Sequence, residues 1–135
     1  MEITETPTRV QRKRTKGWRM GDAVYVGRGS KWGNQITFRR VPGGKYEICE
    51  IYQGELISEG LPLADSAEEA RRRVVDFYTG LMDNAMPQTH AKIKAELAGK
   101  NLACWCPLAD AQGNHVPCHA DVLLEIANQK EKDNR

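Results

Sequence analysis

Hydrophobic and polar positions in the first half of the chain alternate in short runs that predict strands. The run "AVYVG" is β-branched and aromatic and ends on glycine, which indicates a buried strand at residues 23–27. "QITFRRV" alternates polar with apolar residues and predicts a strand at 35–41. "KYEICEIYQ" alternates again after a Pro-Gly-Gly turn, and "GELISEG" continues the pattern. We therefore expect a β-meander.

From Ser66 onward the hydrophobic period changes from two to about 3.6 residues. Ser66 and Glu69 have the spacing of a capping box. Apolar residues then recur at helical spacing: Ala67, Ala70, Val74, Phe77, Tyr78 and Leu81. This pattern predicts a helix at 67–83 whose outward face carries Arg71, Arg72 and Asp76.

The last third of the chain predicts two more helices around one buried strand. A weaker helix is expected at 87–98, with Pro87 at its first position. "NLACWC" predicts a buried strand at 101–105, and Pro117 is expected to open a final helix at 117–128.

This order of elements predicts an α/β fold, a small single-domain sheet with a β-meander insertion and about three helices packed on it. The strands at 23–27 and 101–105 are apolar enough to be central, and a polar loop follows each. Ligands usually bind at the carboxyl edge of such sheets. We expect these two strands to be parallel neighbours in one sheet, so that their loops line one crevice and Arg28, Lys31 and Asn34 lie near Cys118 and His119.

Length and composition indicate one domain in a chain of 135 residues. Residues 1–22 are expected to be a basic arm, 23–128 the α/β domain and 129–135 a polar tail. The chain shows neither the roughly 18 apolar residues of a membrane span nor the apolar core of a secretory signal, so we expect a cytoplasmic protein without a membrane partner. In a reducing compartment its four cysteines favour thiols or metal ligands over disulfides.

The distribution of charge is more informative than the net charge of +2. Residues 9–19 carry six cations and no acid: Arg9, Arg12, Lys13, Arg14, Lys16 and Arg19. Such a run is typical of a surface that binds the phosphates of nucleic acid. A solvated basic arm without a ligand is the alternative.

Three of the four cysteines and two of the three histidines fall within residues 104–119. Cys104 and Cys106 point to the same side of a strand, and Cys118 and His119 lie in the first turn of a helix. Three sulfurs and one imidazole form a recognised zinc set, so we predict that these four residues bind zinc. Neighbouring side chains on a helix diverge by about 100°, which makes His115 an alternative fourth ligand.

Two other interpretations of this segment stay open. Cys118 and His119 are candidate catalytic residues, because a helix N-terminus favours the thiolate form of a cysteine. The cysteines can also serve packing alone, which is the role we expect for the isolated Cys49.

The loop "GRGSKWGN" is a candidate binding site for a phosphate or carboxylate. Its glycines allow close backbone approach, and its polar side chains supply charge and hydrogen bonds: Arg28, Ser30, Lys31 and Asn34. The spacing matches no established phosphate-binding motif, and a plain surface turn is the alternative.

Three stretches resemble domain-of-unknown-function family 4326, a group of small bacterial and bacteriophage proteins. They are "TRVQRKRTKGWRM", "VYVGRGSKWGN" and "LACWCPL…PCHADVLLEIAN", in the family's order and over about a third of the chain. Gly29 and Gln35 stand where the family usually has proline, and the segment between Cys106 and Cys118 is longer than usual. The resemblance implies no particular reaction. Polar family-pattern residues in loops at one sheet edge favour a binding site.

These observations lead to two functional hypotheses. The first is a nucleotide-, nucleoside- or nucleic-acid-directed protein, an enzyme or a binding protein, in which the anion-binding loop 28–34 faces the Cys/His site at 104–119. The alternative is a non-catalytic, zinc-stabilised module that binds nucleic acid or a host protein. The expected partner is a phosphate-bearing ligand or nucleic acid, in the bacterial host cell if the chain is phage-encoded.

Overall fold

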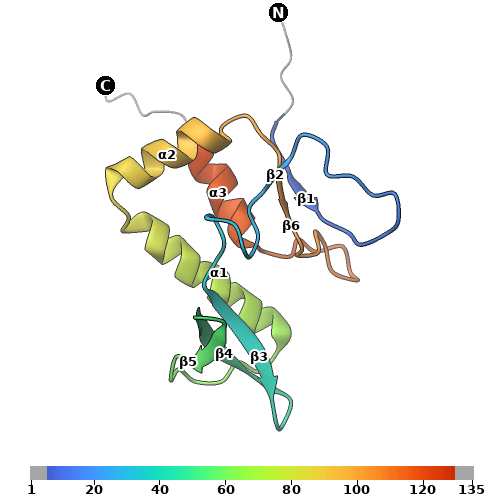
Figure 1. Ribbon diagram of the computed structural model, residues 1–135. Coiled ribbons are helices and arrows are strands. Elements are labelled where there is room, and N and C mark those ends of the chain that lie inside the picture. Colours follow the sequence, from blue (N-terminus) through green and yellow to red (C-terminus); the bar gives the residue numbers. More distant parts are fainter. Residues whose placement is uncertain (1–5, 130–135) are drawn as a thin grey trace, which may run out of the picture.

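The computed structural model describes residues 6–129 and contains two three-stranded sheets and three helices (Figure 1). The mixed α/β class and the three helices are confirmed. The meander forms a sheet of its own, which the prediction of one sheet with an insertion had not separated. We name the two sheets A and B.

Sheet A is parallel and has the strand order β1-β6-β2. Its strands are β1 (Arg9–Gln11), β6 (Leu102–Cys104) and β2 (Val24–Tyr25). Gln11 pairs with Cys104, and Tyr25 pairs with Ala103. The expectation that the second and the last strand are parallel neighbours is therefore confirmed, although both are shorter than predicted.

Strand β1 comes from the segment that we expected to be a basic arm. Residues 9–11 pair along their whole length with β6, and the backbone N–H of Arg12 extends the ladder to the carbonyl of Cys104. Arg9 is 7 % exposed, so this part of the segment belongs to the domain and not to an arm. The segment Arg9–Gln11 has only three residues, two of them polar, and so short a pattern does not predict a strand.

Sheet B is an antiparallel meander of β3 (Ile36–Val41), β4 (Lys45–Tyr52) and β5 (Glu55–Ser58). Its inner face packs on the first half of the long helix α1 (Ala67–Asp83). Ser66 caps α1 by accepting a hydrogen bond from the backbone N–H of Glu69, as its spacing predicted.

Helices α2 (Pro87–Leu97) and α3 (His119–Ala127) pack against sheet A. Helix α3 begins two residues later than predicted, because Cys118 has extended backbone angles and serves as the N-cap. The Asp121 carboxylate accepts a hydrogen bond from the backbone N–H of Cys118, 3.0 Å away, and so completes a capping box.

Helix α1 joins two separate hydrophobic cores. Ala70 belongs to the core under sheet B, whereas Tyr78 belongs to the core shared by sheet A, α2 and α3. Leu81, which the pattern placed on the buried face, is 57 % exposed and belongs to neither core. None of the helices in residues 6–129 has the length and apolarity needed to cross a bilayer.

Candidate functional site

A cleft of about 520 Å³ lies between the two sheets, and we call it the central cleft. Its walls come from the carboxyl ends of β2 and β6, the start of α3, strand β3 and the middle of α1. Polar or reactive lining residues are Tyr25, Arg28, Asn34, Thr37, Arg71, Cys104, Trp105, Cys106, Cys118 and His119. The shared crevice that the sequence predicted therefore exists, and no acidic residue is among the described residues that line it.

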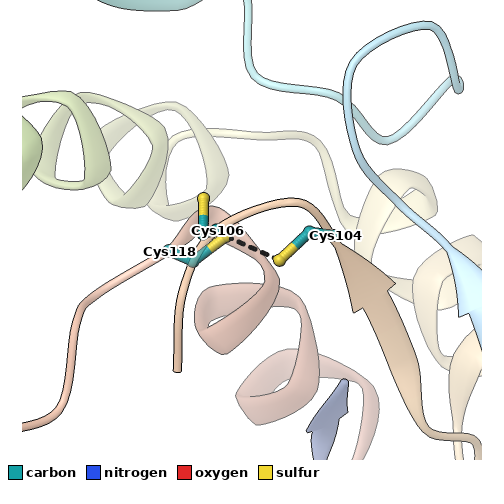
Figure 2. A group of neighbouring side chains, drawn as sticks. All are labelled: Cys104, Cys106 and Cys118. Carbon is teal, nitrogen blue, oxygen red and sulfur yellow. Dashed lines mark hydrogen bonds between the residues drawn. The ribbon is translucent and has the colours of Figure 1, made fainter. Parts of the chain in front are cut away.

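The cysteine cluster consists of Cys104, Cys106 and Cys118, whose sulfur atoms all lie within 4.8 Å of one another (Figure 2). Cys104 ends β6, Cys106 lies two residues on, and Cys118 caps α3. The Cys104 and Cys118 sulfurs are 3.3 Å apart, and both side chains are buried. The parallel register and the loop at 107–117 thus bring together three of the four predicted ligands.

Hydrogen bonds within the cluster shift the pKa values of the three thiols in different directions. Hydrogen bonds from Cys104 and Cys118 lower the pKa of Cys106, which favours its thiolate. Its hydrogen bond with Cys106 is the main cause that raises the pKa of Cys104, and hydrogen bonding with Cys104 does the same for Cys118. Cys118 is also withdrawn from solvent, at 2 % exposure. This weighs against Cys118 as a reactive nucleophile, which needs an accessible thiolate.

The cluster fits a thiophilic metal ion. Zinc–sulfur bonds of about 2.3 Å in a tetrahedral site place sulfurs about 3.8 Å apart, so the sulfurs of Cys104 and Cys118, now 3.3 Å apart, would separate only slightly around a metal. Three converging sulfur ligands are the kind of set that thiophilic metal ions prefer.

His119 is held as a neutral imidazole beside the cluster. Its Nε2 donates a hydrogen bond to the Val26 carbonyl at 2.7 Å, and burial lowers its pKa. Its Nδ1 lies 3.6 Å from the Cys118 sulfur but outside the group of ligand atoms that are mutually close. The fourth position on a metal is thus left to Nδ1, which faces Cys118, or to a ligand from the cleft.

His115, the alternative fourth ligand, points elsewhere. Its Nε2 lies 2.9 Å from the Asp121 carboxylate, and its side chain is 63 % exposed. Asp121 also binds the buried guanidinium of Arg9 at 2.9 Å, and Arg9 donates a second hydrogen bond to the Pro107 carbonyl. Arg9 therefore ties β1 to both the cysteine loop and α3, and it is unavailable to nucleic acid.

The glycine loop, residues 27–34, contributes fewer ligand-binding groups than expected. Only Arg28 and Asn34 of the four predicted residues line the cleft. Asn34 uses its amide on the Val74 carbonyl and the Ile36 N–H, so both of its polar atoms hold the loop in place. Ser30 bonds back to the Gly27 carbonyl, and Lys31 pairs with Glu96 of α2 at 2.6 Å. Of the four predicted residues, Arg28 is thus the one whose charged group lines the central cleft.

The ends of the glycine loop approach so closely that a side chain would clash. A Cβ atom on Gly33 would lie 2.9 Å from the Gly27 carbonyl oxygen, which is backbone and has little freedom to move. Glycine at this position is what lets the loop close and present Arg28 at the cleft.

Arg71 is the site residue that sequence reasoning missed. It was expected to face outward from α1, but it is half-buried and lines the central cleft, with its guanidinium carbon 5.6 Å from the ring centre of Phe38. Position 71 adjoins Ala70 and follows Ala67 by four residues, so it lies at the border of the apolar face. A border position turns inward only when another element faces it, and here sheet B does.

Two of the remaining cations of the basic segment, Arg12 and Arg14, lie against the rings of Tyr25 and Trp105. The guanidinium of Arg12 stands 4.7 Å from the ring centres of both Tyr25 and Trp105, and that of Arg14 stands 4.6 Å from Trp105. Lys13, Lys16 and Arg19 are exposed. We call the group of Arg12, Arg14, Tyr25 and Trp105 the arginine–aromatic stack.

Comparison with known protein families identifies the family of this chain. Residues 10–129 match the family model described as Domain of unknown function (DUF4326). The chain belongs to this family. The match to family 4326 begins within β1 and ends two residues beyond α3, so it includes the glycine loop and the cysteine cluster. Neither the curated proteins nor the solved structures contain a match.

Proposed function

We propose that this member of family 4326 binds a phosphate-bearing ligand, a nucleotide or nucleic acid, in the central cleft beside a zinc ion held by the cysteine cluster. The observation that carries the proposal is the meeting of Arg28 and Arg71 with the three cysteines in one cleft without a described acidic lining residue. Two cations there gain most from an anionic ligand, and guanidinium groups match phosphate by paired hydrogen bonds.

The dimensions of the cleft agree with a ligand of this class. A volume of about 520 Å³ lies within the range of small-molecule and cofactor sites. Phe38 and Val74 supply an apolar wall on which a base or sugar can pack, opposite the cysteines. A bound zinc ion would supply Lewis acidity or an activated water at this place. The protein's own contribution is to orient the phosphate through Arg28, which Thr37 steadies by a hydrogen bond of 3.2 Å.

The test is binding of thymidine monophosphate and inorganic phosphate by calorimetry, with metal content measured on protein purified without chelators. Loss of one charge-assisted contact costs about 1.5–3 kcal/mol, so Arg28→Gln and Arg71→Gln should each weaken binding by about ten-fold or more. Lys31→Gln removes the same charge from the same loop but from a side chain that pairs with Glu96, and it should have little effect. Equal loss in all three variants, or no binding by the wild type, contradicts the proposal.

A non-catalytic, zinc-stabilised module is the second candidate function. It is favoured by His119, whose Nε2 is already committed to the Val26 carbonyl and which therefore locks α3 to β2. In that case one zinc ion per chain should resist exchange, and ligand should leave the spectrum of a cobalt-substituted protein unchanged. A ligand-induced shift of the cobalt bands would instead favour an open metal position in the cleft.

A further inference from the structure

We propose that the ligand is a single strand of nucleic acid, whose backbone crosses the arginine–aromatic stack and whose end enters the central cleft. This inference rests on the proposed function, because it extends the phosphate site in the cleft to a polymer. It adds a second binding surface on the other side of Tyr25 and Trp105.

The register of sheet A places the stack. Val10, Ala103 and Tyr25 are register partners, and side chains two residues apart on a strand share a face. Arg12 and Trp105 follow Val10 and Ala103 by two residues, so they share the face of Tyr25. Cys104 and Leu102 belong to the opposite face, in the core with α2 and α3. The stack therefore belongs to the face of sheet A opposite that core. Figure 1 shows α2 and α3 together on one side of the sheet.

The two arginines of the stack lack acidic partners. Within residues 6–129 no carboxylate forms an ion pair with Arg12 or Arg14, although Arg9 in the same segment has one. The Nε of Arg12 is buried and has no hydrogen-bond acceptor in this part of the chain. A cation that is partly withheld from water and unpaired is stabilised by an added anion.

The aromatic rings orient these guanidinium groups and restrict their motion, which favours the binding of phosphate. A guanidinium that lies over a ring keeps its N–H edge free for a planar acceptor, and its restricted motion reduces the entropy lost on binding. Arg12 and Arg14 approach the same Trp105 ring, so their edges can serve neighbouring phosphates. A ligand with one phosphate would use only part of this surface.

The stack and the cleft are continuous. Tyr25 and Trp105 belong to the stack and also line the cleft, together with Arg28 on its rim. A strand that crosses the stack therefore leads to the cleft and to the cysteine cluster. A cleft of about 520 Å³ admits a nucleotide-sized group and not the end of a duplex. The nucleotide that enters must be unpaired, which favours a single strand over a duplex as the ligand.

The experiment follows the binding of a short fluorescein-labelled oligodeoxythymidylate by anisotropy over a range of salt concentrations. For single strands the slope of log K against log salt changes by about 0.7 per phosphate contact, so Arg12→Gln/Arg14→Gln should flatten it by about 1.4. The matched control is Arg39→Gln/Arg40→Gln, which removes two charges from exposed residues of sheet B and should leave the slope unchanged. Thermal melts check folding, and the exposed Arg14→Gln alone should still flatten the slope by about 0.7.

The outcomes separate this inference from the proposed function. Binding of thymidine monophosphate without binding of the oligonucleotide overturns the single-strand inference and leaves the phosphate site standing. If neither thymidine monophosphate nor the oligonucleotide binds, both the single-strand inference and the proposed function are contradicted. Equal loss of affinity in the sheet B control, binding of a duplex as tight as that of the single strand, or equally tight binding of poly-glutamate overturns the inference.

Discussion

Sheets A and B each contain three strands, yet they differ in how they are assembled and in what they carry. Sheet B is built from consecutive segments joined by tight turns, and its edge strand β5 is exposed throughout. Sheet A joins three segments that are far apart in the chain, and all of its central strand β6 is buried. Parallel strands bring their carboxyl ends to one edge, and at this edge the cysteine cluster, Arg12 and Arg28 meet. Sheet B therefore forms a wall of the central cleft, whereas sheet A positions the cysteine cluster, Arg12 and Arg28.

The ion pairs of the two sheets show the same contrast. In sheet A the side chain of Arg9 is 3 % exposed and binds Asp121, whereas in sheet B the side chain of Arg39 is 44 % exposed and binds Glu47. A buried cation without its partner is strongly destabilising, whereas an exposed pair contributes little. Substitutions in sheet A should therefore have larger effects than matched substitutions in sheet B.

The largest expected effect is that of removing a ligand from the cysteine cluster. Cys104→Ser should abolish stoichiometric metal, because serine replaces a thiolate and leaves two sulfurs. If free metal exceeds the Kd about 1,000-fold, its loss lowers stability by about 4 kcal/mol. Elemental analysis and thermal unfolding measure both effects.

The control is Cys49→Ala, in the buried cysteine of sheet B. This variant should keep the full metal content. Its midpoint of thermal unfolding should fall only slightly, because only a small amount of packing is lost. An equal metal content in Cys104→Ser and Cys49→Ala would show that the cluster binds no metal.

Truncation of a central side chain should produce the next largest effect. Leu102 in β6 is fully buried, so Leu102→Ala should lower the free energy of unfolding by about 3 kcal/mol. Leu56 in β5 is 40 % exposed, and Leu56→Ala should change it by about 0.5 kcal/mol or less. Urea unfolding measures both, and similar losses would mean that the sheets are equally well packed.

Arg9→Met should have a somewhat smaller effect than Leu102→Ala. Breaking a buried ion pair costs about 3–5 kcal/mol, and partial exposure of Asp121 reduces this to an expected loss of about 2 kcal/mol. The change also removes the hydrogen bond to Pro107, so the loop at 107–117 should loosen and the metal affinity should fall. The matched Arg39→Met in sheet B should leave both the urea midpoint and the metal affinity unchanged.

The smallest expected effect is a pH dependence in sheet B. Hydrogen bonds from Ser58 and Arg39 lower the pKa of Glu47 from its ordinary value of 4.5. A carboxyl with a lowered pKa in the folded state stabilises the fold above its ordinary pKa, and this stabilisation is lost as the pH falls through the folded value. Glu47→Gln should flatten the acid limb of stability against pH slightly. If the acid limb of stability has the same slope in Glu47→Gln as in the wild type, Glu47 does not contribute to this pH dependence.

Local elements of the fold could be predicted because their signals lie within a few residues. The bounds of α1 followed from Ser66 and from apolar residues at helical spacing. The meander followed from alternation around glycine turns, and the gathering of Cys104, Cys106 and Cys118 followed from a strand and a helix start. The parallel pairing of β2 with β6 was also predicted, from the apolar character of both segments.

Other features depend on which distant segment lies opposite, and no local pattern encodes that partner. The tertiary structure alone decided that Arg9 is buried against Asp121, that Lys31 turns to Glu96 and that Arg71 turns into the cleft. It also decided that Arg12 meets Tyr25 and Trp105, since their meeting requires the strand order β1-β6-β2. A side chain's type is written in the sequence, whereas its role depends on the free energy of contacts with residues far along the chain. The sequence by itself determined the thiol cluster and the elements other than β1, and packing between non-local segments determined which charges face the central cleft.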